Sequence, residues 1–389
     1  MSTVLANQTG PQSSGGVSGI TSAYLLSKSK GNTVTLVAKH MPGDYDIEYA
    51  SPFAGANVLP MNSDANSRWE RRTWPEFEWL CRNVPEAGFH FKNTRVYRKH
   101  KDLNPATGSA PMDPLFDLDP WYRHMMPDYR ELEASELPPG QDSGCTFTSV
   151  CMNTPMYLSW LVGQCVRNGV VFRRAVLSEL SEARRLSHTG RPADIIVNAT
   201  GLGALKLGGV KDTAMIPARG QVVLVRNDRP SMLVTSSVDD GSGEVFYMMS
   251  RAAGGGTIIG GTYDIGNWES QPCPNIAARI MSRAVRLDPE LAKGKGVIGL
   301  DVVRHAVGLR PFRTGGVRIE RETLRDDTDG GSVHIVHNYG HAGWGYQGSF
   351  GCAERVVELV NEIRAAKGDD LSKEPTLLNF ENETVASKL

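Results

Sequence analysis

One arginine of this sequence stands in surroundings suited to binding a carboxylate. Residues 308–313 read Gly-Leu-Arg-Pro-Phe-Arg, so Arg310 lies between an apolar residue and a proline that stiffens the backbone. A guanidinium held in one plane can bind a carboxylate through two parallel hydrogen bonds. The same surroundings would suit a buried arginine with a purely structural partner, and the sequence alone leaves both interpretations open.

A glycine-rich segment follows farther along the chain. Residues 337–353 read HNYGHAGWGYQGSFGCA and lie between an apolar stretch, 332–336, and an amphipathic one, 351–367. A strand, a glycine turn and a helix in this order bring backbone N–H groups and the positive end of a helix together. Such a site could stabilise the negative charge of a reduced flavin ring. For His337 and His341, both beside glycine turns, we expect structural hydrogen bonds rather than catalysis.

A second glycine cluster lies near the N-terminus. Dinucleotide-binding turns follow the pattern GxGxxG, whose glycines allow a tight turn, a close pyrophosphate and helix packing. Gly16 and Gly19 match the second and third glycines, but Ser14 stands at the first. The nearest strand-like residues, 3–6, lie far upstream, so either an insertion lengthens the loop or the first strand is lost or altered. A glycine-capped surface helix is the alternative interpretation.

The residues after this cluster predict a helix over 17–30 and a strand over 33–38 that ends at Lys39 and His40. Dinucleotide sites usually carry an acidic residue at this distance, which binds the ribose hydroxyls. Lys39 could instead favour a 2′-phosphate or the pyrophosphate of a flavin. A solvated, charged strand end explains these residues equally well.

The composition excludes several classes of protein. Lysine plus arginine number 42 and aspartate plus glutamate 43, and the net charge of −1 argues against a general nucleic-acid-binding surface. No apolar run approaches the roughly 18 residues of a membrane span. The six cysteines are scattered without zinc-ligand spacing, which predicts reduced thiols and no metal site. We therefore expect neither nucleic acid nor a membrane as a partner.

The middle of the chain is predicted to be rich in sheet. Residues 193–201 are expected to form a buried strand that ends in a glycine turn. Turn residues separate further expected strands over residues 220–226, 245–251 and 257–262 and favour a mainly antiparallel sheet. Helices are expected over residues 66–83, 155–169 and 276–291. Residues 57–149 otherwise read as an inserted, less regular region. Features of a nucleotide-binding βαβ unit thus occur at both ends of the chain.

Several of these segments together resemble the D-amino-acid oxidase family. The resemblance begins near residue 17, reaches the C-terminus, and rests on HNYGHAGWGYQGSFGCA, GLRPFR, AGGGTIIGGTYDIGNW at 253–268, NATGLGA at 198–204 and SPFAGAN at 51–57. The pairing of HNYGH with GLRP at this separation is shared mainly with the sister D-aspartate oxidases. It implies an α/β fold with a Rossmann-like FAD-binding domain and an interleaved α+β substrate domain on a mainly antiparallel sheet. The implied FAD-binding domain comprises residues 1–55, 150–215 and 310–389, and the substrate-binding and interface domain residues 56–149 and 216–309.

The resemblance also implies roles for individual residues. Arg310 would bind the substrate α-carboxylate with help from the hydroxyl of Tyr247. The Gly343 carbonyl would accept a hydrogen bond from the amine, and Gln347 would meet the flavin or an ordered water. The positions that match FAD contacts are Gly16, Val17, Ser18, Gly19, Lys39, His40, Ser51, Ala54, Gly55, Asn57, Val176, Gly201, Arg310, Gly343, Trp344, Gly345, Tyr346 and Gln347. Family members often carry a second tyrosine in the loop before the Tyr247 strand, and residues 229–243 contain none.

The implied activity is the oxidative deamination of neutral D-amino acids. A hydride passes from the α-carbon to flavin N5, molecular oxygen is reduced to hydrogen peroxide, and a 2-oxo acid and ammonia are formed. A homodimer is left open.

Three alternatives remain at this point. A D-aspartate oxidase would need a further cation, for which Arg251 and Arg313 are available, although both are expected outside the pocket. An NADP-linked dehydrogenase rests on Lys39 and His40 alone. A cofactor-poor, inactive relative would follow if the altered N-terminal glycine motif no longer bound FAD.

The last three residues, Ser387, Lys388 and Leu389, form the tripeptide SKL, a peroxisomal address that an import receptor reads. The polar stretch NFENETVA before it is expected to leave it exposed. We therefore expect the protein in the peroxisomal matrix, a compartment that houses oxidases releasing hydrogen peroxide.

Overall fold

The computed structural model describes residues 2–7, 15–103, 106, 114–239, 241, 243–326, 331–372 and 374. The chain forms two compact units. Unit 1 comprises Met1–Tyr49, Leu158–Ile216 and Pro311–Leu389, and unit 2 comprises Ala50–Tyr157 and Pro217–Arg310. The sequence predicted boundaries after residues 55 and 149, whereas in the structure these two boundaries lie after residues 49 and 157.

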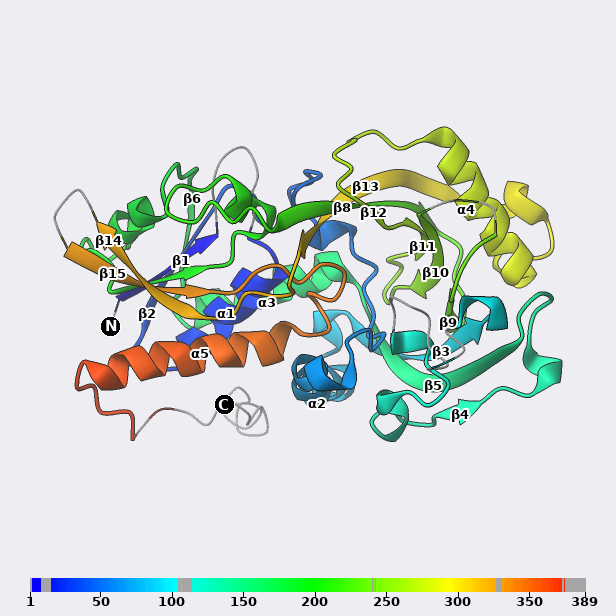
Figure 1. Ribbon diagram of the computed structural model, residues 1–389, viewed down its shortest axis with the longest axis horizontal. Helices are drawn as coiled ribbons and strands as arrows, with labels where there is room; N and C mark the ends of the chain where they lie inside the picture. The colour runs from blue at the N-terminus through cyan, green and yellow to red at the C-terminus, as the bar shows by residue number, and fades with distance from the viewer. Residues whose placement is uncertain are drawn as a thin grey trace. The chain divides into compact units, whose positions relative to one another are not determined.

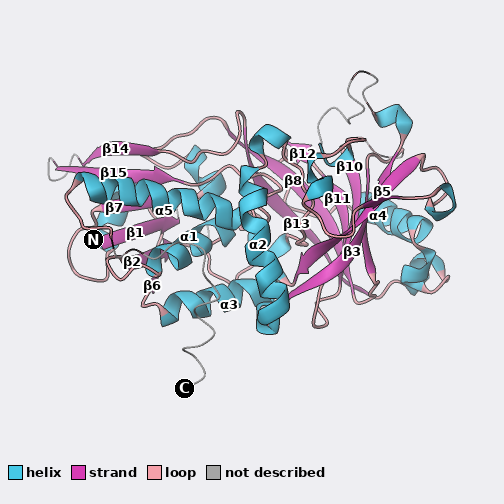
Figure 2. Ribbon diagram, turned by 90° about the horizontal axis from the view of Figure 1, so that it is seen from below, coloured by secondary structure: helices cyan, strands magenta, loops and turns pink. Residues whose placement is uncertain are grey.

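Unit 1 is built on one sheet with six strands among the described residues (Figures 1 and 2). Their order and bounds are β14 (Arg321–Asp326), β15 (Gly331–His337), β7 (Ile195–Asn198), β1 (Ser2–Asn7), β2 (Thr33–Ala38) and β6 (Val171–Arg174). Every neighbouring pair is parallel except β14 and β15. The carboxyl ends of the parallel strands therefore share one edge, and in such sheets ligands bind beyond that edge.

The first strand is present and central. β1 pairs in parallel with β2 on one side and with β7 on the other, so that Leu5 stands opposite Leu36 and Val197. The expectation that this strand could be lost is therefore wrong. A longer connecting loop agrees with a strand that ends at Asn7 and a helix α1 that begins at Val17. Ser14, at the position of the first motif glycine, lies outside the described residues.

Helices α1 (Val17–Ser27) and α5 (Ser349–Ala366) run side by side along the sheet of unit 1 (Figures 1 and 2). Both were predicted from their apolar spacing. A core between the sheet and the 3-10 helix η8 (Leu180–Leu186) contains Val37, Leu180, Ile196 and Ile335. Helix α3 (Thr154–Arg167) precedes β6. The packed helices and core hold the carboxyl edge of the sheet in one arrangement.

Unit 2 is built on a nine-stranded sheet within the described part of the chain. The order and bounds are β12 (Asp264–Ile265), β8 (Met215–Val225), β11 (Thr257–Thr262), β10 (Glu244–Ser250), β9 (Ser231–Thr235), β3 (Phe89–Arg98), β5 (Ser143–Met152) and β4 (Arg130–Glu131), and β13 (Val302–Arg313) also pairs with β8. Only β3 and β9 pair in parallel along this order. The expectation of a mainly antiparallel sheet agrees with this pairing.

The prediction that residues 57–149 form a less regular region is wrong for two long strands, although only short 3-10 helices and the two-residue strand β4 are described between them. This segment contains β3 and β5, which pair antiparallel over ten residues from Phe89 opposite Met152 to Arg98 opposite Ser143. It also contains the expected helix α2 (Arg68–Asn83). Polar residues interrupt the apolar pattern of both strands, and their pairing joins residues far apart in the chain. Neither feature gives a local periodic signal.

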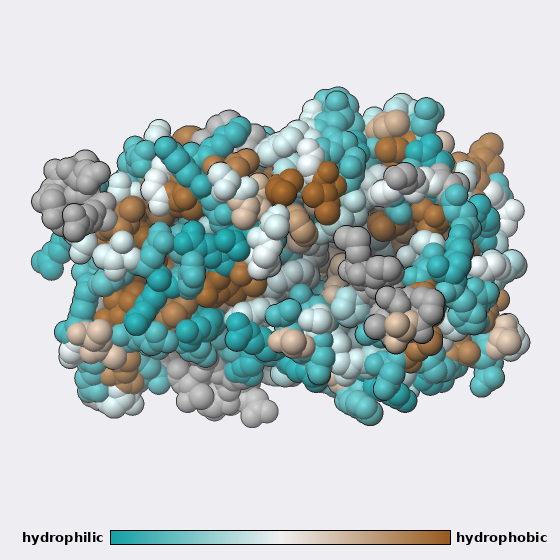
Figure 3. Space-filling view, viewed as in Figure 1, coloured by the Kyte–Doolittle hydropathy of each residue, from teal (hydrophilic) through white to brown (hydrophobic). Residues whose placement is uncertain are grey.

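The sheet of unit 2 packs on helix α4 (Pro274–Leu287). Ile280 and Ala284 of this helix join Val223, Phe246 and Ile259 of the sheet in one buried cluster. On the face drawn in Figure 3, hydrophilic residues cover most of the surface and apolar residues occur in separate groups. Among the helices that the structure describes, none has both the length and the apolar character needed to cross a membrane.

Candidate active site

Arg310 is held by three groups within unit 2. Its Nη1 atom donates to the carbonyl oxygen of Thr262 at 3.0 Å, and Nη2 donates to the hydroxyl oxygen of Tyr247 at 3.1 Å. The ring centroid of Tyr263 lies 5.1 Å from Cζ of the guanidinium, within the range of a cation–π contact. We call these four residues the carboxylate clamp.

No carboxylate among the described residues neutralises the charge of Arg310, whose guanidinium is only partly exposed. Nη1 and Nη2 each carry two hydrogens, and the contacts above use one hydrogen of each. The remaining N–H groups can therefore bind a carboxylate as a fork.

Glycines make room for the clamp. Tyr247 on β10 stands opposite Gly260 of β11. A Cβ atom added at Gly260 would lie 2.0 Å from Cζ of Tyr247, and one added at Gly220 of β8 would lie 2.4 Å from Nη1 of Arg310. Both distances are far below van der Waals contact, so a side chain at either position would displace the tyrosine or the arginine.

The sequence identified Arg310 and Tyr247 but missed the other clamp residues. Thr262 and Tyr263 lie at the end of β11 and directly after it, inside a stretch used only for the family resemblance. The available signal was a tyrosine directly after a Gly-Gly-Thr strand end, but nothing in the sequence relates that position to Arg310 across 47 residues.

Apolar side chains surround the base of Tyr247. Tyr247, Phe53 and Met249 pack against a buried cluster of unit 2 that comprises Val222, Leu224, Ile258 and Ala306. The side chains of this cluster carry no charge, and the guanidinium of Arg304 lies 5.9 Å from the ring centroid of Phe53.

The two arginines considered for a second carboxylate are already engaged. Arg251 donates to the carbonyl oxygens of Ala54 and Gly55. Arg313 forms an ion pair with Asp212 at 2.8 Å. Arg251 is thus buried and held by backbone carbonyls, and the charge of Arg313 is paired with a carboxylate.

Five predicted cofactor contacts fall in unit 2, namely Ser51, Ala54, Gly55, Asn57 and Arg310. The sequence had assigned all of these except Asn57 to the FAD-binding segments. Backbone hydrogen bonds join Ala56 to Met152 in both directions, at 3.2 and 2.8 Å, and Arg251 binds the two preceding carbonyls. These contacts fasten the segment to β5 and to the end of β10.

The two glycine clusters predicted from the sequence meet within unit 1. Ser18 Oγ lies 3.4 Å from Nδ1 of His341, and Asn338 Nδ2 donates to Ser22 Oγ at 3.0 Å. Gly16 is the N-cap residue of α1, and neither a side-chain cap nor an acidic residue in the first turn offsets the positive end of this helix. An anion would be stabilised there.

The cofactor residues predicted in unit 1 all follow carboxyl ends of parallel strands. Gly16 follows β1, the pair Lys39 and His40 follows β2, Val176 follows β6, Gly201 follows β7, and the group Gly343, Trp344, Gly345, Tyr346 and Gln347 follows β15. Gly201 has a φ of 56°, a conformation that favours glycine. Val176 is 61% exposed, and its neighbour Ala175 donates to the carbonyl of Ala38 at 3.1 Å. The edge thus collects these predicted contacts from separate parts of the chain.

Unpartnered hydroxyl groups at this edge fit a polar cofactor. Thr200 Oγ1, directly before Gly201, and Ser349 Oγ, the first residue of α5, are buried and have no hydrogen-bond partner among the described residues. Helix α5 begins after Gly348 and, like α1, lacks a side-chain cap. Two uncapped helix N-termini beside glycine-rich loops provide donors for a pyrophosphate and a flavin ring. The residues present therefore fit FAD.

The loop after β2 is tied to the N-terminal motif. The hydroxyl of Tyr49 donates to the carbonyl oxygen of Gly15 at 2.9 Å, and the Tyr49 ring stacks on His40 with centroids 6.1 Å apart. Burial, together with the nearby charge of Asp46, raises the pKa of Glu48 to about 7. At and below neutral pH much of this carboxyl group is uncharged, which reduces its repulsion of a phosphate.

His337 and His341 make structural hydrogen bonds. His341 Nε2 lies 3.1 Å from Asn338 Oδ1, and burial lowers the pKa of His341 to about 4. The ring is thus neutral at pH 7. His337 lies between Asn198 and Glu322, at 3.1 Å from each. Both rings are engaged, which agrees with the structural role expected from the sequence.

The loop that carries Gly343 is fastened to the residues that follow Arg310 in the chain. The N–H of Ala342 donates to the carbonyl of Pro311 at 2.9 Å. Tyr339 donates through its hydroxyl to Asp212 at 2.8 Å, and the same carboxylate oxygen binds Arg313. Burial opposes ionisation of Asp212, but these hydrogen bonds outweigh it and lower its pKa.

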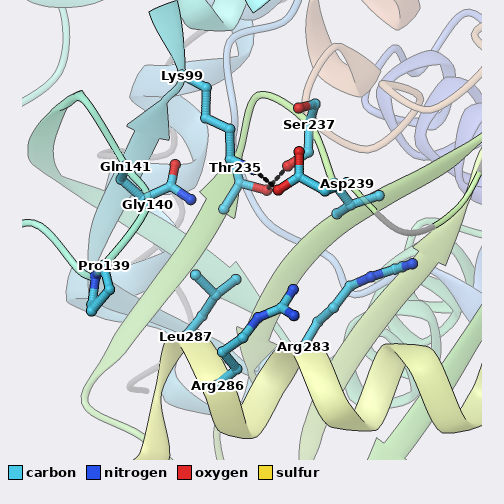
Figure 4. Close-up of a pocket in the computed structure, with 11 residues that line it drawn as sticks. Lys99, Pro139, Gly140, Gln141, Thr235, Ser237, Asp239, Arg283, Arg286 and Leu287 are labelled. Atoms are coloured by element: carbon cyan, nitrogen blue, oxygen red, sulfur yellow. Dashed lines mark hydrogen bonds and ion pairs between the residues drawn. The ribbon is translucent and has the colours of Figure 1, made fainter. Parts of the chain in front are cut away.

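A cavity of about 80 Å³ in unit 2 involves none of the predicted site residues. Figure 4 shows Arg283, Arg286 and Leu287 of α4 facing Ser237 and Asp239 of the loop between β9 and β10. The charges that line it are largely paired, because Asp239 binds Lys99 at 2.5 Å and Glu244 binds Arg283 at 2.5 Å. We therefore do not regard this cavity as a candidate active site.

A metal centre finds no support in the described residues, where no group of three or more His, Cys, Asp or Glu is arranged to hold an ion. The six cysteines all lie in the described residues, and none of them forms a disulfide there.

Comparisons with known proteins identify relatives over nearly the whole chain. The family described as FAD dependent oxidoreductase matches residues 15–359. The chain is 62% identical over 353 residues to a D-amino-acid oxidase of Fusarium vanettenii, which covers 90% of this chain and 96% of that protein. It is 33% identical over 355 residues to a D-amino-acid oxidase of Schizosaccharomyces pombe, at 90% and 96% coverage.

Solved structures share the fold. Glycine oxidase from Bacillus cereus superposes with a TM-score of 0.67 at 16% sequence identity, covering 97% of this chain and 98% of that chain. This agrees with the predicted α/β fold of a flavin-dependent oxidoreductase.

Proposed function

The chain belongs to the FAD-dependent oxidoreductase family that includes the D-amino-acid oxidases, and on that premise we propose that its substrates are D-amino acids with neutral side chains. It is a flavin-dependent oxidase that uses FAD, removes the amino group of a D-amino acid and passes the electrons to molecular oxygen. The products are a 2-oxo acid, ammonia and hydrogen peroxide.

The observation that carries the proposal is the unneutralised Arg310. A partly buried cation without a carboxylate of its own, held by Tyr247 and Thr262, favours a ligand that brings a carboxylate. Every amino acid has one on its α-carbon. The clamp would hold it in one orientation and so fix where the α-hydrogen points.

The residues expected to hold FAD in unit 1 are the glycines after β1 and β7, the end of β2, and the segment Gly343–Gln347. FAD, once bound there, supplies the two-electron acceptor for the α-hydrogen of the substrate. The protein's part is to orient the substrate and to bind it with its amine in the neutral form. The Gly343 carbonyl would accept a hydrogen bond from the neutral amine. No histidine is needed as a base, because His337 and His341 are buried and already hydrogen-bonded.

The preference for neutral side chains is supported by the apolar surface beside Tyr247 and by the engagement of Arg251 and Arg313. A side-chain carboxylate would have to lose water beside these apolar side chains, which costs several kcal/mol in a partly buried site unless a cation pairs with it. We therefore expect D-aspartate to be a poor substrate.

The test uses purified protein with its flavin content measured by absorbance after release. Peroxide formation is followed with D-alanine, D-methionine, D-aspartate and L-alanine. We expect flavin close to one per chain and a kcat/KM for D-alanine at least about tenfold above that for D-aspartate, which is a difference of about 1.4 kcal/mol. A preference for D-aspartate would overturn the assignment of the side chain, and activity with L-alanine alone would overturn that of chirality.

We also propose import into the peroxisomal matrix by a receptor that reads Ser387, Lys388 and Leu389. These residues lie outside the described part of the chain, and the proposal rests on the sequence. A fluorescent fusion with the native C-terminus should accumulate in peroxisomes, and one in which Leu389 is replaced by Asp should not. Equal distribution of the two fusions would refute it. The homodimer left open by the sequence also remains a proposal, and sedimentation of the holoenzyme at several concentrations would decide it.

A further inference from the structure

The loop after β2 carries three carboxyl groups to the place where an anion is expected in unit 1. They belong to Asp44, Asp46 and Glu48. Tyr49, the next residue, donates through its hydroxyl to the carbonyl oxygen of Gly15 at 2.9 Å, and the N–H of Gly15 donates to the carbonyl oxygen of His40. Gly15 directly precedes the N-cap residue of α1. The loop is therefore fastened at both ends to the helix terminus that is expected to receive the pyrophosphate of FAD.

The three carboxyl groups differ in their partners. Arg174, at the end of β6, donates to Asp44 and lowers the pKa of that carboxyl group, so Asp44 stays ionised at neutral pH. Asp46 accepts the N–H of Glu48 at 3.0 Å through Oδ1. Glu48 is half-buried, and no cation among the described residues forms an ion pair with it. Burial without a charged partner disfavours the ionised form of a carboxyl group.

The balance of charges around Glu48 places its ionisation near neutrality. Desolvation by burial and the charge of Asp46 raise its pKa, Lys39 and Lys206 lower it, and the result is about 7. Lys39 follows β2, and Lys206 follows the 3-10 helix η9 (Gly201–Leu205). Two elements thus direct positive charge toward this carboxyl group. A change in nearby charge moves such a group between its protonated and ionised forms.

The other charged groups beside this loop keep their charge as the pH rises above neutrality. Nδ1 of His40 lies 3.8 Å from Asp44 and Nε2 lies 3.8 Å from Asp46, and burial lowers the pKa of the ring, which is therefore neutral at pH 7 and above. Asp44 and Arg174 remain a charged pair. Among these groups, Glu48 is the one that loses a proton as the pH rises through neutrality.

A bound pyrophosphate changes the balance at Glu48. Its negative charge repels an ionised carboxylate and competes with it for the positive charges of Lys39 and Lys206. A protonated Glu48 carries no charge and has an O–H group that can donate to a phosphate oxygen. The protonated form is therefore the one that suits the phosphates of the cofactor.

We propose that Glu48 couples cofactor binding to proton uptake: its carboxyl group takes one proton from solvent when the pyrophosphate of FAD binds at the N-terminus of α1, and returns it when FAD leaves. This concerns the cofactor and goes beyond the proposed substrate preference. FAD is held more tightly as the pH falls through neutrality. The opposite dependence would hold if an ionised Glu48 accepted hydrogen bonds from the ribose hydroxyls, the usual role of an acidic residue near this point of a dinucleotide site.

The experiment measures the dissociation constant of FAD between about pH 6 and 8.5. Holoenzyme is dialysed to equilibrium against a series of FAD concentrations at each pH, and bound flavin per chain is read from its absorbance. We expect Kd to be nearly constant below about pH 6.5 and to rise about three- to tenfold up to pH 8.5, because a nearby phosphate charge should raise the pKa of the carboxyl group by about half a unit to one unit. The slope of log Kd against pH gives the number of protons taken up, which should not exceed about one.

Glu48→Gln is the matched variant, because it keeps a hydrogen-bonding side chain of similar size without the charge. Its Kd should vary less than about twofold over the whole range and, at pH 8.5, lie about three- to tenfold below that of the unaltered protein. Glu358→Gln removes an exposed carboxyl group of α5 and should retain the pH dependence of the unaltered protein. His40→Gln should also retain the rise above pH 7, whatever its effect on Kd itself, because this ring is already neutral there.

Asp46→Asn gives an independent check. The amide oxygen can still accept the N–H of Glu48, but the charge that helps to keep Glu48 protonated is gone, so the rise in Kd should begin at lower pH. A Kd of the unaltered protein that is independent of pH, or that falls as the pH rises, would overturn the proposal. So would an unchanged pH dependence in Glu48→Gln, or a rise that disappears in His40→Gln.

Discussion

Replacing Arg310 tests the central assignment of the site. In the structure its guanidinium donates to Thr262 and Tyr247 and keeps further N–H groups available. A bound α-carboxylate would receive two charge-assisted hydrogen bonds, each worth about 1.5–3 kcal/mol. Arg310→Leu should remove both, about 3–6 kcal/mol, which corresponds to a fall in kcat/KM of roughly a hundredfold to ten-thousandfold.

The chemistry of the side chain predicts a graded series. Arg310→Lys keeps the charge but not the fork, and should lose about half of that free energy, or roughly ten- to a hundredfold in kcat/KM. The assay is peroxide formation from D-alanine, with flavin content and melting temperature measured on the same samples. Arg226→Leu is the control, since this exposed arginine of unit 2 pairs only with Asp301 in the described structure and should alter kcat/KM less than twofold.

One outcome would refute this reasoning directly. If Arg310→Leu keeps its flavin and its melting temperature and has the KM of the unaltered enzyme, the arginine is a structural residue. The substrate carboxylate would then have to be bound elsewhere, and the assignment of Tyr247 would fall with it.

Three further predictions concern a glycine of unit 2 and two titratable residues of unit 1. Gly220→Ala should raise KM about tenfold, because its Cβ would meet the guanidinium of Arg310 at 2.4 Å. The control is Gly163→Ala on α3, where an added Cβ would have no atom within 4 Å; this variant should be neutral or raise the free energy of unfolding by up to about 1 kcal/mol. His341 has a pKa lowered to about 4, so the unfolded chain binds a proton below pH 6.5 that the folded protein does not. Between pH 6.5 and 4 the free energy of unfolding, measured in urea, should fall more steeply in the unaltered protein than in His341→Gln, by up to about 1.4 kcal/mol per pH unit. Parallel slopes for the two proteins would contradict the lowered pKa of His341. Asp212→Asn should lower the free energy of unfolding by about 1–3 kcal/mol at pH 7, measured in urea, with the difference shrinking as acid protonates the native aspartate; a variant of equal stability would count against the network.

The sequence predicted the elements with strong local patterns. Helices α1 and α5 have apolar residues at helical spacing, and Arg310 and Tyr247 stand in segments typical of a family. It failed where structure depends on distant partners. β3 and β5 stabilise each other across the sheet, and neither has an alternating pattern strong enough to identify it alone.

The candidate site shows the same limit. Gly220 and Tyr263 meet Arg310 only because β8, β11 and β13 lie close together in one sheet. Residue types and spacing carry no record of which strands are neighbours. The N-terminal motif left two alternatives open, an insertion in the loop or a lost or altered first strand. The parallel pairing of β1 with β2 and β7 shows that the strand is present.

The glycines that crowd the clamp restrict how this enzyme could be re-engineered. At positions 220 and 260 every amino acid other than glycine collides with Arg310 or Tyr247, so variation there removes the function common to all substrates before it alters the choice among them. Positions 53 and 249 carry ordinary apolar side chains, Phe and Met, which pack against the same buried cluster as Tyr247. These side chains can be exchanged for larger or smaller ones. Libraries intended to broaden the range of accepted amino acids should therefore diversify these two positions and leave the glycines invariant.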